Sequence, residues 1–345
     1  METKTSDNNL VERLLRGDKR ALAKSISLVE NEAADSTALL DALYPKLGHA
    51  YRIGITGPPG AGKSTLVDQL TKYYRKQGKT VGIIAVDPTS PFTGGALLGD
   101  RVRMSDVSLD EGVYIRSMAT RGSLGGLASK ADDAADILDA FGKDYVILET
   151  VGVGQSELDI AEAADTTIVV LVPESGDGIQ AMKAGLMEIA DLFVVNKADR
   201  EGADQAITEI KAMLQLGTQK AWPPRVLKTV ANEGQGIEAL AEAVEAHRRF
   251  LNEQALLEAK RKERLLKKVK SIVRFRFERA FWDESAYQTV NETLANYDHL
   301  KTSPYKLAEE LIENFKRKLE QRDGKGKPRG HRESQTGVGE ESRSR

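Results

Sequence analysis

A glycine-rich stretch near residue 60 constrains the fold of this chain more than any other feature. It reads Gly57-Pro58-Pro59-Gly60-Ala61-Gly62-Lys63-Ser64. A β-prone run, residues 51–56, precedes it, and apolar residues at helical spacing follow it over residues 65–73. Strand, glycine-rich loop, Lys-Ser and helix in this order are typical of a P-loop, in which backbone N–H groups and a helix N-terminus converge on one phosphate. The stretch therefore predicts a nucleotide-phosphate site in an α/β fold.

Each part of this loop has an expected role. The glycines let several backbone N–H groups point at one phosphate. Lys63 is expected to reach the β- and γ-phosphates as a catalytic residue, and the Ser64 hydroxyl to hold Mg²⁺. We predict nucleotide contacts for Gly57, Pro58, Pro59, Gly60, Ala61, Gly62, Lys63, Ser64 and Thr65.

Short apolar runs recur between residues 81 and 230, as expected for parallel strands buried on both faces. They are residues 81–86, 113–115, 145–148, 167–172, 192–195 and 225–230. Helical segments lie between most of them, which predicts a mostly parallel, doubly wound sheet flanked by helices. Ligands bind such sheets at the carboxyl ends of the strands. The P-loop, Asp87, Glu149 and Asn196 all come directly after a predicted strand.

The composition shifts along the chain predict four regions. Residues 1–50 form an N-terminal helical extension, residues 51–250 a P-loop domain, residues 251–321 a helical region, and residues 322–345 a disordered tail. In the helical region, the basic stretch 253–279 is expected to be a solvated helix face, with a docking surface for an acidic partner as the alternative. Residues 305–315 predict an amphipathic helix that packs or dimerises.

Composition also bounds the classes of function. The 345 residues include no cysteine, which excludes disulfides, thiolate metal sites and cysteine nucleophiles. The 50 basic and 52 acidic side chains nearly cancel, so no global field draws the chain to nucleic acid or to a membrane. No apolar run approaches the roughly 20 residues that span a bilayer, and the N-terminus lacks a signal-peptide core. We expect a soluble cytoplasmic protein without a nucleic-acid or membrane partner.

The sequence Asn196-Lys197-Ala198-Asp199 predicts which base is bound. A carboxylate at Asp199 can accept hydrogen bonds from both N1–H and the 2-amino group of guanine, a pair that adenine lacks, and a buried acceptor left unpaired is costly. Lys197 is expected to pack its stem along the base. A later loop, Val230-Ala231-Asn232, stands where related proteins carry Ser-Ala, and the Ala231 amide is expected to meet guanine O6.

Carboxylates after the strands are candidates for the metal shell. Glu149, in Glu149-Thr150-Val151-Gly152, occupies the Walker B and switch II position and can hold Mg²⁺ through a water, while the Gly152 amide can contact the γ-phosphate. Asp87 and Asp100 are further candidates, because Mg²⁺ takes few carboxylates directly. For Asp100 a salt bridge or helix cap is the alternative, and Arg103 either neutralises phosphate or pairs with Asp100.

Two other glycine-containing segments leave alternatives open. Residues 121–127 form either a backbone nest near phosphate or a tight turn. Residues 173–183 form a long loop at the ligand edge of the sheet, suited either to a mobile switch or to a passive connection.

Taken together, five motifs resemble the MeaB/ArgK/MMAA family of G proteins over residues 10–320. They are the P-loop and residues 86–91, 121–127, 149–157 and 196–199. The resemblance implies a homodimeric GTPase with a C-terminal dimerisation arm. By this resemblance it would serve an adenosylcobalamin-dependent acyl-CoA mutase, usually methylmalonyl-CoA mutase. It would gate the loading of the cofactor and protect the mutase, and it would meet the cobalamin only through that partner.

The resemblance also implies residue roles. Catalytic roles fall to Lys63, Asp87, Glu149 and Lys183, the last as the partner-sensitive residue of the loop 173–183. Metal roles fall to Ser64, Asp87, Asp100 and Glu149. Nucleotide contacts beyond the P-loop fall to Gly152, Asn196, Lys197, Asp199, Val230, Ala231 and Asn232.

Three other functions remain open from the residues. A P-loop small-molecule kinase linked to basic amino-acid transport shares the loop but would need an acceptor pocket. A metal-insertion GTPase normally needs a His or Cys cluster, whereas the four histidines are dispersed at His49, His247, His299 and His331. A binding module that holds GTP without hydrolysing it is the third.

Overall fold

The computed structural model of the chain describes residues 10–87, 107–119, 126–150, 156–174, 185–216, 220–295 and 303–324. By its contacts the chain divides into two compact units, Met1–Ile272 and Val273–Arg345, each described by itself here. Among the described residues, no helix is both long and apolar enough to span a membrane. The domain boundaries expected at residues 50, 250 and 321 stay predictions.

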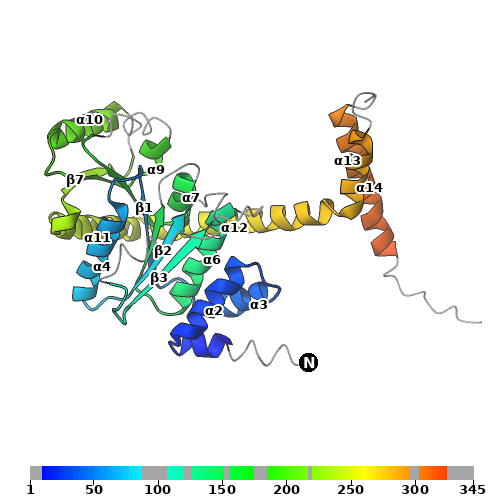
Figure 1. Ribbon diagram of the computed structural model, residues 1–345, viewed down its shortest axis with the longest axis horizontal. Helices are drawn as coiled ribbons and strands as arrows, with labels where there is room; N and C mark the ends of the chain where they lie inside the picture. Colours follow the sequence, from blue (N-terminus) through cyan, green and yellow to red (C-terminus); the bar gives the residue numbers. More distant parts are fainter. Residues whose placement is uncertain are drawn as a thin grey trace, which may run out of the picture. The chain divides into compact units, whose positions relative to one another are not determined.

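A parallel sheet forms the centre of the first unit (Figure 1). Its seven described strands lie in the order β3-β2-β4-β1-β5-β6-β7, and every neighbouring pair is parallel. The strands are β1 Tyr51–Thr56, β2 Val81–Asp87, β3 Val113–Ala119, β4 Tyr145–Thr150, β5 Thr166–Leu171, β6 Leu192–Asn196 and β7 Arg225–Thr229.

The order of the strands places the P-loop at a reversal of the chain. From β1 the chain moves outward to β2 and β3, returns to β4 beside β1, and then crosses to β5 on the other side. Ligands on open α/β sheets bind at such a switch point, outside the carboxyl ends of the strands. The predicted doubly wound fold is confirmed, and its switch point lies where the glycine-rich loop begins.

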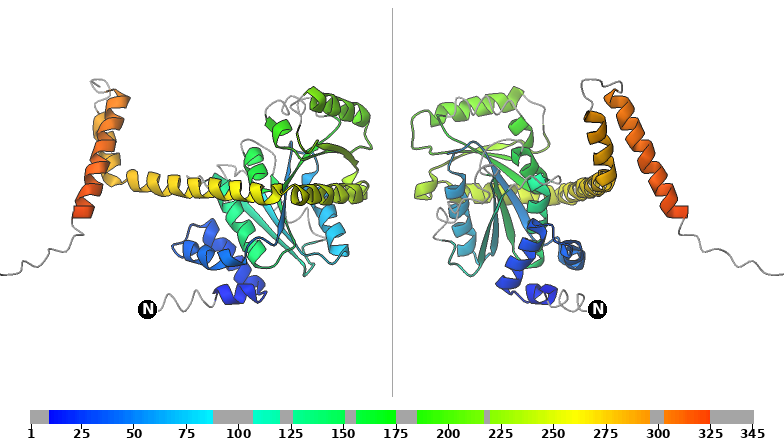
Figure 2. Two further views of the ribbon diagram at one scale, coloured as in Figure 1. Left: turned by 180° about the vertical axis from the view of Figure 1, so that it is seen from behind. Right: turned by 45° about the vertical axis from the view of Figure 1, so that its right-hand side comes forward.

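Helices cover both faces of the sheet (Figure 1 and Figure 2). On one face α4 Lys63–Lys76 and α11 Ile237–Glu253 pack against alternate strand residues such as Ile55 and Ile147. The intervening residues point to the opposite face, because side chains alternate along a strand. There they meet α6 Gly126–Ala140, α7 Ser156–Ala163 and α10 Ala203–Leu216, and the short α9 Met187–Ile189.

The N-terminal helices share the core of this second face. Residues 10–15 are helical and are followed by α2 Lys19–Glu30, α3 Ser36–Leu43 and the 3₁₀ turn η1 Tyr44–Lys46. The Asp18 carboxylate caps α2 by accepting from the backbone of Arg20 and Ala21. Most of the apolar positions that helical spacing predicts for this segment are buried in this core: Leu10, Leu14, Leu22, Ile26, Val29, Leu39 and Leu43. Val11 and Leu40 are partly buried against it, and Leu15 is exposed.

Helix α12, Leu256–Phe281, contains the boundary between the two units. Its basic side chains were expected to face solvent, and for four of them the structure shows otherwise. Lys260, Arg261 and Arg264 form ion pairs with Asp165 and Asp191, which precede β5 and β6, and Lys268 pairs with aspartates of α6. Asp165, which is fully buried before β5, accepts from Arg261 at 3.0 Å and from Arg264 at 3.1 Å. These four side chains therefore dock α12 within its own chain, while the other basic side chains of the stretch, such as Lys262 and Lys270, are exposed as expected.

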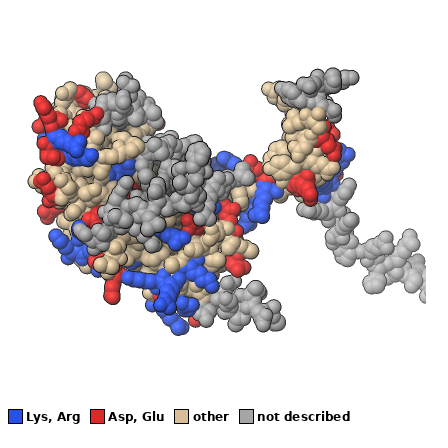
Figure 3. All heavy atoms as spheres, viewed as in Figure 1, with Lys and Arg blue, Asp and Glu red and all other residues tan. Residues whose placement is uncertain are grey.

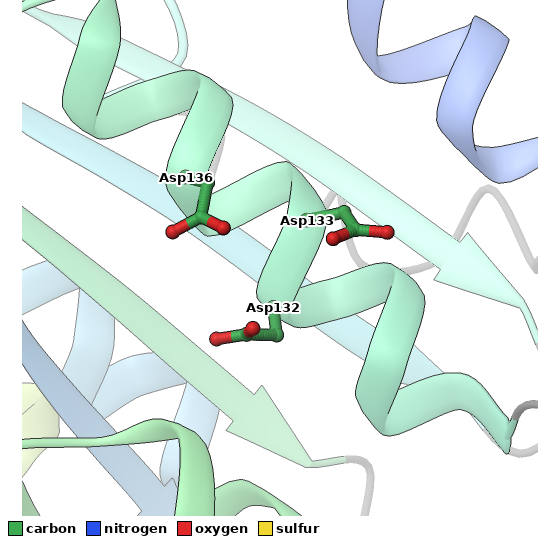
Figure 4. A group of neighbouring side chains, drawn as sticks. All are labelled: Asp132, Asp133 and Asp136. Atoms are coloured by element: carbon green, nitrogen blue, oxygen red, sulfur yellow. The ribbon is translucent and has the colours of Figure 1, made fainter. Parts of the chain in front are cut away.

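Lys268 lies against three aspartates of α6, Asp132, Asp133 and Asp136, which Figure 4 shows. Its ammonium lies 2.9 Å from Asp132, 2.6 Å from Asp133 and 2.5 Å from Asp136, and Arg52 of β1 pairs with two of the three. Burial alone would raise the pKa of Asp132, but Lys268 and Arg52 outweigh it and lower that pKa. We call this group of five residues the Lys268 clamp.

The described part of the second unit holds the end of α12, α13 Glu284–Leu294 and α14 Pro304–Gly324. Asp283 caps α13 and also pairs with Lys318 of α14. The predicted amphipathic helix 305–315 lies inside α14. Ala286 and Leu311 are buried, whereas Tyr305 is 83% exposed.

On the face of the molecule that Figure 3 shows, acidic and basic side chains of the described residues are interspersed.

Candidate functional site

The P-loop connects the end of β1 to the start of α4 and needs glycine at two positions. Gly57 has a φ of 138°, and a Cβ atom there would lie 2.0 Å from the Val170 carbonyl oxygen of β5. Gly62 has a φ of 85°, and a Cβ atom there would lie 2.4 Å from Asn196 Nδ2. Both backbone conformations are ones that L side chains rarely adopt. The loop therefore keeps bare amides at the carboxyl edge of the sheet.

Lys63 folds back over this loop. Its Nζ donates to the carbonyl oxygens of Gly57 at 2.7 Å and Pro58 at 3.0 Å. The side chain is 5% exposed, although it belongs to the first residue of α4. Its ammonium is thus held at the mouth of the loop, beside the amides on which a phosphate would rest.

Two of the predicted metal residues meet directly. Ser64 Oγ, in the first turn of α4, donates to Glu149 Oε1 at the end of β4 over 2.6 Å. Glu149 is 2% exposed. Asp87 ends β2, whose register with β4 sets Val86 opposite Thr150, so its backbone reaches the same edge of the sheet. The Asp87 side chain lies outside the described part.

Three other predicted residues also fall outside the described residues: Asp100, Gly152 and Lys183. The same holds for residues 121–125 and for most of the loop 173–183.

Asn196, at the end of β6, joins the predicted guanine site to the P-loop. Its Nδ2 donates to the Ala61 carbonyl oxygen at 2.9 Å, and its Oδ1 accepts from Thr229 Oγ1 at 3.0 Å and from the Ala231 amide at 3.1 Å. Lys197 has a φ of 56°, and its Nζ donates to the Gly60 carbonyl oxygen at 2.8 Å. The structure therefore brings the predicted base-binding segments together.

The Ala231 amide, which is expected to face guanine O6, donates to Asn196 Oδ1 in this structure. Val230 is buried and exchanges backbone hydrogen bonds with Gln235. Asp199, the predicted guanine selector, is exposed next to Lys197. The roles of Ala231 and Asp199 toward guanine stay predictions.

Sequence reasoning missed two contacts at this edge of the sheet. Arg200 pairs with Glu174 at 2.9 Å, which joins the turn after β6 to the segment where the loop 173–183 begins. The hydrogen bond from Arg200 lowers the pKa of Glu174. Thr150 Oγ1 donates to Thr56 Oγ1 at 3.1 Å. Neither pair follows a local pattern, since the partners are 26 and 94 residues apart.

Metal sites outside this edge find little support among the described residues. The Asp132, Asp133 and Asp136 group has the spacing of a cation site (Figure 4), but Lys268 already lies among the three carboxylates. His247 is buried against Thr166, with a pKa lowered by burial. This leaves the metal-insertion alternative without a histidine cluster in the part of the chain that the structure describes.

A family model described as methylmalonyl Co-A mutase-associated GTPase MeaB matches residues 22–286. The chain belongs to this family. The match spans the P-loop, Glu149 and the Asn196–Asp199 turn, so these motifs belong to the family's shared region. The predicted family is confirmed.

Similar proteins agree with this assignment. A putative GTPase of Pyrococcus horikoshii is 54% identical over 270 residues, covering 77% of this chain and 85% of the relative. GTPase ArgK of Escherichia coli is 41% identical over 243 residues, covering 68% and 73%. A solved structure described as a LAO/AO transport system kinase has a TM-score of 0.69 and 28% identity, covering 92% of this chain and 99% of that one. The predicted GTPase activity and P-loop α/β fold are confirmed.

Proposed function

We propose that this MeaB-family GTPase is a chaperone of an adenosylcobalamin-dependent acyl-CoA mutase similar to methylmalonyl-CoA mutase. In this proposal the GTPase gates loading of the cobalamin and protects the mutase, and it meets the cobalamin only through that enzyme. The observation that carries the proposal is the match of residues 22–286 to a family described as associated with methylmalonyl-CoA mutase. A cytoplasmic location is part of the proposal.

GTP hydrolysis is an in-line attack of water on the γ-phosphate, so the protein mainly holds the triphosphate and neutralises its charge. The bare amides of the loop between Gly57 and Gly62, with the N-terminus of α4, form the cradle. Lys63 supplies positive charge at the mouth of that cradle. We propose that the Gly152 amide adds a γ-phosphate contact.

Mg²⁺ fits the oxygens that meet at the start of α4. Ser64 Oγ and Glu149 Oε1 lie 2.6 Å apart, and hydroxyl and carboxylate oxygens are the hard ligands that Mg²⁺ takes. We propose that Ser64, Asp87, Asp100 and Glu149 surround the ion, directly or through water. When bound, Mg²⁺ neutralises phosphate charge.

Guanine selection in this proposal rests on the turn after β6. Asn196 fixes the turn against Ala61 of the P-loop, which sets the base site at a constant distance from the phosphate site. Lys197 lies over Gly60, where its stem can line the base. Asp199 then accepts from N1–H and the 2-amino group of guanine.

The proposed homodimer is supported by exposed apolar side chains at helical spacing on α12: Leu265, Leu266, Val269, Ile272, Val273 and Phe277. Large apolar side chains exposed in a row on one helix mark an interaction surface. A second copy of the chain is the occupant that we propose. Lys183 in the loop 173–183 is proposed to sense the mutase.

The experiment that tests the proposed function is capture of partners from the native lysate on the tagged, full-length GTPase. One arm is loaded with a non-hydrolysable GTP analogue and the other with GDP. We expect a cobalamin-dependent mutase in the captured proteins, in amounts that differ between the two arms, and faster GTP hydrolysis when that mutase is added back. Absence of such a mutase from both arms would contradict the proposal.

The solved relative described as a LAO/AO transport system kinase keeps one alternative in view, a kinase acting on basic amino acids. GTP labelled at the γ-phosphate, incubated with arginine or ornithine, separates the two. We expect label in free phosphate alone, and labelled amino acid would favour the kinase.

A further inference from the structure

Two side-chain hydrogen bonds meet at the carboxyl end of β4, one from α4 and one to β1. On the α4 side of the sheet, Ser64 Oγ donates to Glu149 Oε1 at 2.6 Å. The next residue of β4, Thr150, points to the opposite face, because side chains alternate along a strand. There its Oγ1 donates to Thr56 Oγ1 of β1 at 3.1 Å. One bond thus lies on each face of the end of β4.

The threonine pair extends the contact between these strands by one residue. The parallel register of β1 with β4 runs from Tyr51 opposite Tyr145 to Ile55 opposite Glu149. Thr56 and Thr150 come next and are the last residues of their strands. Gly57, the first residue of the P-loop, follows Thr56 directly. The hydroxyl pair therefore joins the strand ends just before the phosphate loop and just after the carboxylate at Glu149.

Both threonine side chains are completely buried in the sheet. A buried hydroxyl destabilises the folded protein unless it is hydrogen-bonded, so valine would serve packing equally well at either position. The contrast is Thr167 of β5, whose buried Oγ1 has no hydrogen-bond partner among the described residues. Burial in this sheet therefore does not by itself require a threonine hydroxyl to be hydrogen-bonded. The hydrogen-bonded Thr56–Thr150 pair lies beside the nucleotide site.

The packing around the pair is tight enough to transmit a displacement. Gly54 lies two residues before Thr56 on the same face of β1, and a Cβ atom there would lie 2.9 Å from Ala164 Cβ. The same Cβ atom would lie 3.0 Å from Ile160 Cγ2 of α7, so the β1 backbone packs closely against that helix and the residue after it. Since close-packed interiors relax only partly, loss of the bond would shift the strand ends rather than be absorbed locally.

We propose that Thr56 and Thr150 are positioning residues for GTP hydrolysis, and that their bond fixes Glu149 relative to the P-loop. Neither threonine belongs to the predicted nucleotide contacts, which come from the P-loop, from Gly152, from the turn after β6 and from residues 230–232. Loss of the bond therefore lowers kcat while leaving the affinity for nucleotide in place. The two threonines act as one unit, so removal of either hydroxyl is sufficient to lose the effect of the bond.

The test compares Thr56→Val, Thr150→Val and the double variant in the full chain. GTP turnover, affinity for a fluorescent GDP analogue and the thermal midpoint are measured for each. Loss of the bond is expected to displace Glu149 by a fraction of an ångström. Each single variant should therefore lose about tenfold in kcat, while KM and the affinity for GDP stay within about twofold of the wild-type values. The double variant is expected to fall no further, because contacting residues that share one interaction are not additive.

Three further variants separate positioning from loss of packing. Thr56→Ser and Thr150→Ser keep the hydroxyl and are expected to keep kcat within about twofold of the wild type. Thr167→Val, the matched control, removes an unbonded hydroxyl and is expected to leave kcat unchanged. If a valine variant does not fold, the serine and alanine variants at that position, which differ from each other by the hydroxyl alone, give the comparison instead.

The proposal is overturned by any of three results. One is a kcat within about twofold of wild type for both valine variants. Another is a double variant whose loss is the product of the two single losses. The third is a rise in KM or a loss of GDP affinity that accounts for the whole change.

Discussion

Asn196 Nδ2 donates to the Ala61 carbonyl oxygen at 2.9 Å, although 135 residues separate the two. This bond fixes the turn after β6, which is predicted to bind the base, to the P-loop, which is predicted to bind the phosphates. The amide oxygen of the same side chain accepts from Thr229 and from the Ala231 amide. One buried side chain thus fixes three segments of the site, and its removal should affect all of them.

Asn196→Ala is expected to weaken GTP binding by at least about tenfold and to lower the free energy of unfolding by about 1–3 kcal/mol, because buried polar groups lose their partners. Titration calorimetry and chemical denaturation measure the two effects. The matched control is Asn252→Ala on the exposed side of α11, where the amide bonds only to the Arg248 carbonyl oxygen of its own helix. Equal behaviour of the two variants would contradict the role of Asn196.

Lys63→Ala is expected to reduce GTP turnover by about 10²–10³-fold, since it removes the positive charge held at the mouth of the P-loop. Release of phosphate under saturating GTP is the measurement. Lys76→Ala, at the exposed far end of the same helix, should hydrolyse GTP at the wild-type rate. Turnover by the Lys63 variant at the wild-type rate would refute the assignment.

Asp199→Asn is expected to exchange the base preference from guanine to xanthine, because an amide donor can face the xanthine O2 that a carboxylate repels. Competition between GTP and xanthosine triphosphate for the site gives the ratio of affinities. Asp204→Asn, at an exposed carboxylate that pairs with Lys228, should leave the ratio unchanged. An unchanged preference in the Asp199 variant would count against this base assignment.

Lys268→Met is expected to destabilise the first unit by about 3–5 kcal/mol, because three neighbouring carboxylates lose the ammonium that compensates them. Chemical denaturation at neutral pH measures this loss. Lys262→Met, at an exposed lysine of α12 that pairs with Glu258, should cost at most about 0.5 kcal/mol. Similar losses of unfolding free energy in the two variants would contradict the stabilising role of the Lys268 clamp.

The same clamp gives a pH dependence with a defined sign. Burial would lower the pKa of Lys268, but the three aspartates outweigh it and raise that pKa. The contribution of Lys268 to folding stability is therefore complete below its unfolded pKa of ~10.4 and is lost progressively as the pH rises above that value. The pKa of Asp132 is lowered, so its contribution is complete above ~3.9 and is lost as the pH falls further. Asp133, whose pKa burial raises, acts in the opposite direction. The Lys268→Met loss should therefore shrink below about pH 4, and a constant loss would contradict this reading.

Val269→Asp is expected to convert the proposed dimer to a monomer by placing a charge in the exposed apolar row of α12. Light scattering coupled to size-exclusion chromatography gives the mass. Lys270→Asp changes the charge of the neighbouring exposed position and should remain dimeric. A monomeric wild type, or a dimeric Val269 variant, would contradict the proposed arm.

The sheet and the P-loop could be predicted because their signals are local. Continuous apolar runs predicted the buried strands, and the P-loop motif predicted the strand before it and the helix after it. Strand β3 was predicted only to residue 115 because Arg116 and Ser117 interrupt the apolar run. Arg116 is accommodated by Ser27 and Glu30 of α2, a tertiary contact that no window of sequence contains.

The candidate site was predicted in part for the same reason. Ser64, Glu149, Asn196 and Lys197 follow motifs, and the structure brings them to one edge of the sheet. The docking of α12 was missed, because a basic helix has the same composition whether solvent or Asp165 faces it.

The measurement that tests the central claim most directly is titration calorimetry of the full chain with GTP and with ATP in the presence of Mg²⁺. The account predicts that GTP binds at least about 100-fold more tightly than ATP, since adenine lacks the donors that Asp199 requires. Equal affinities for the two nucleotides, or no binding of either, would contradict it.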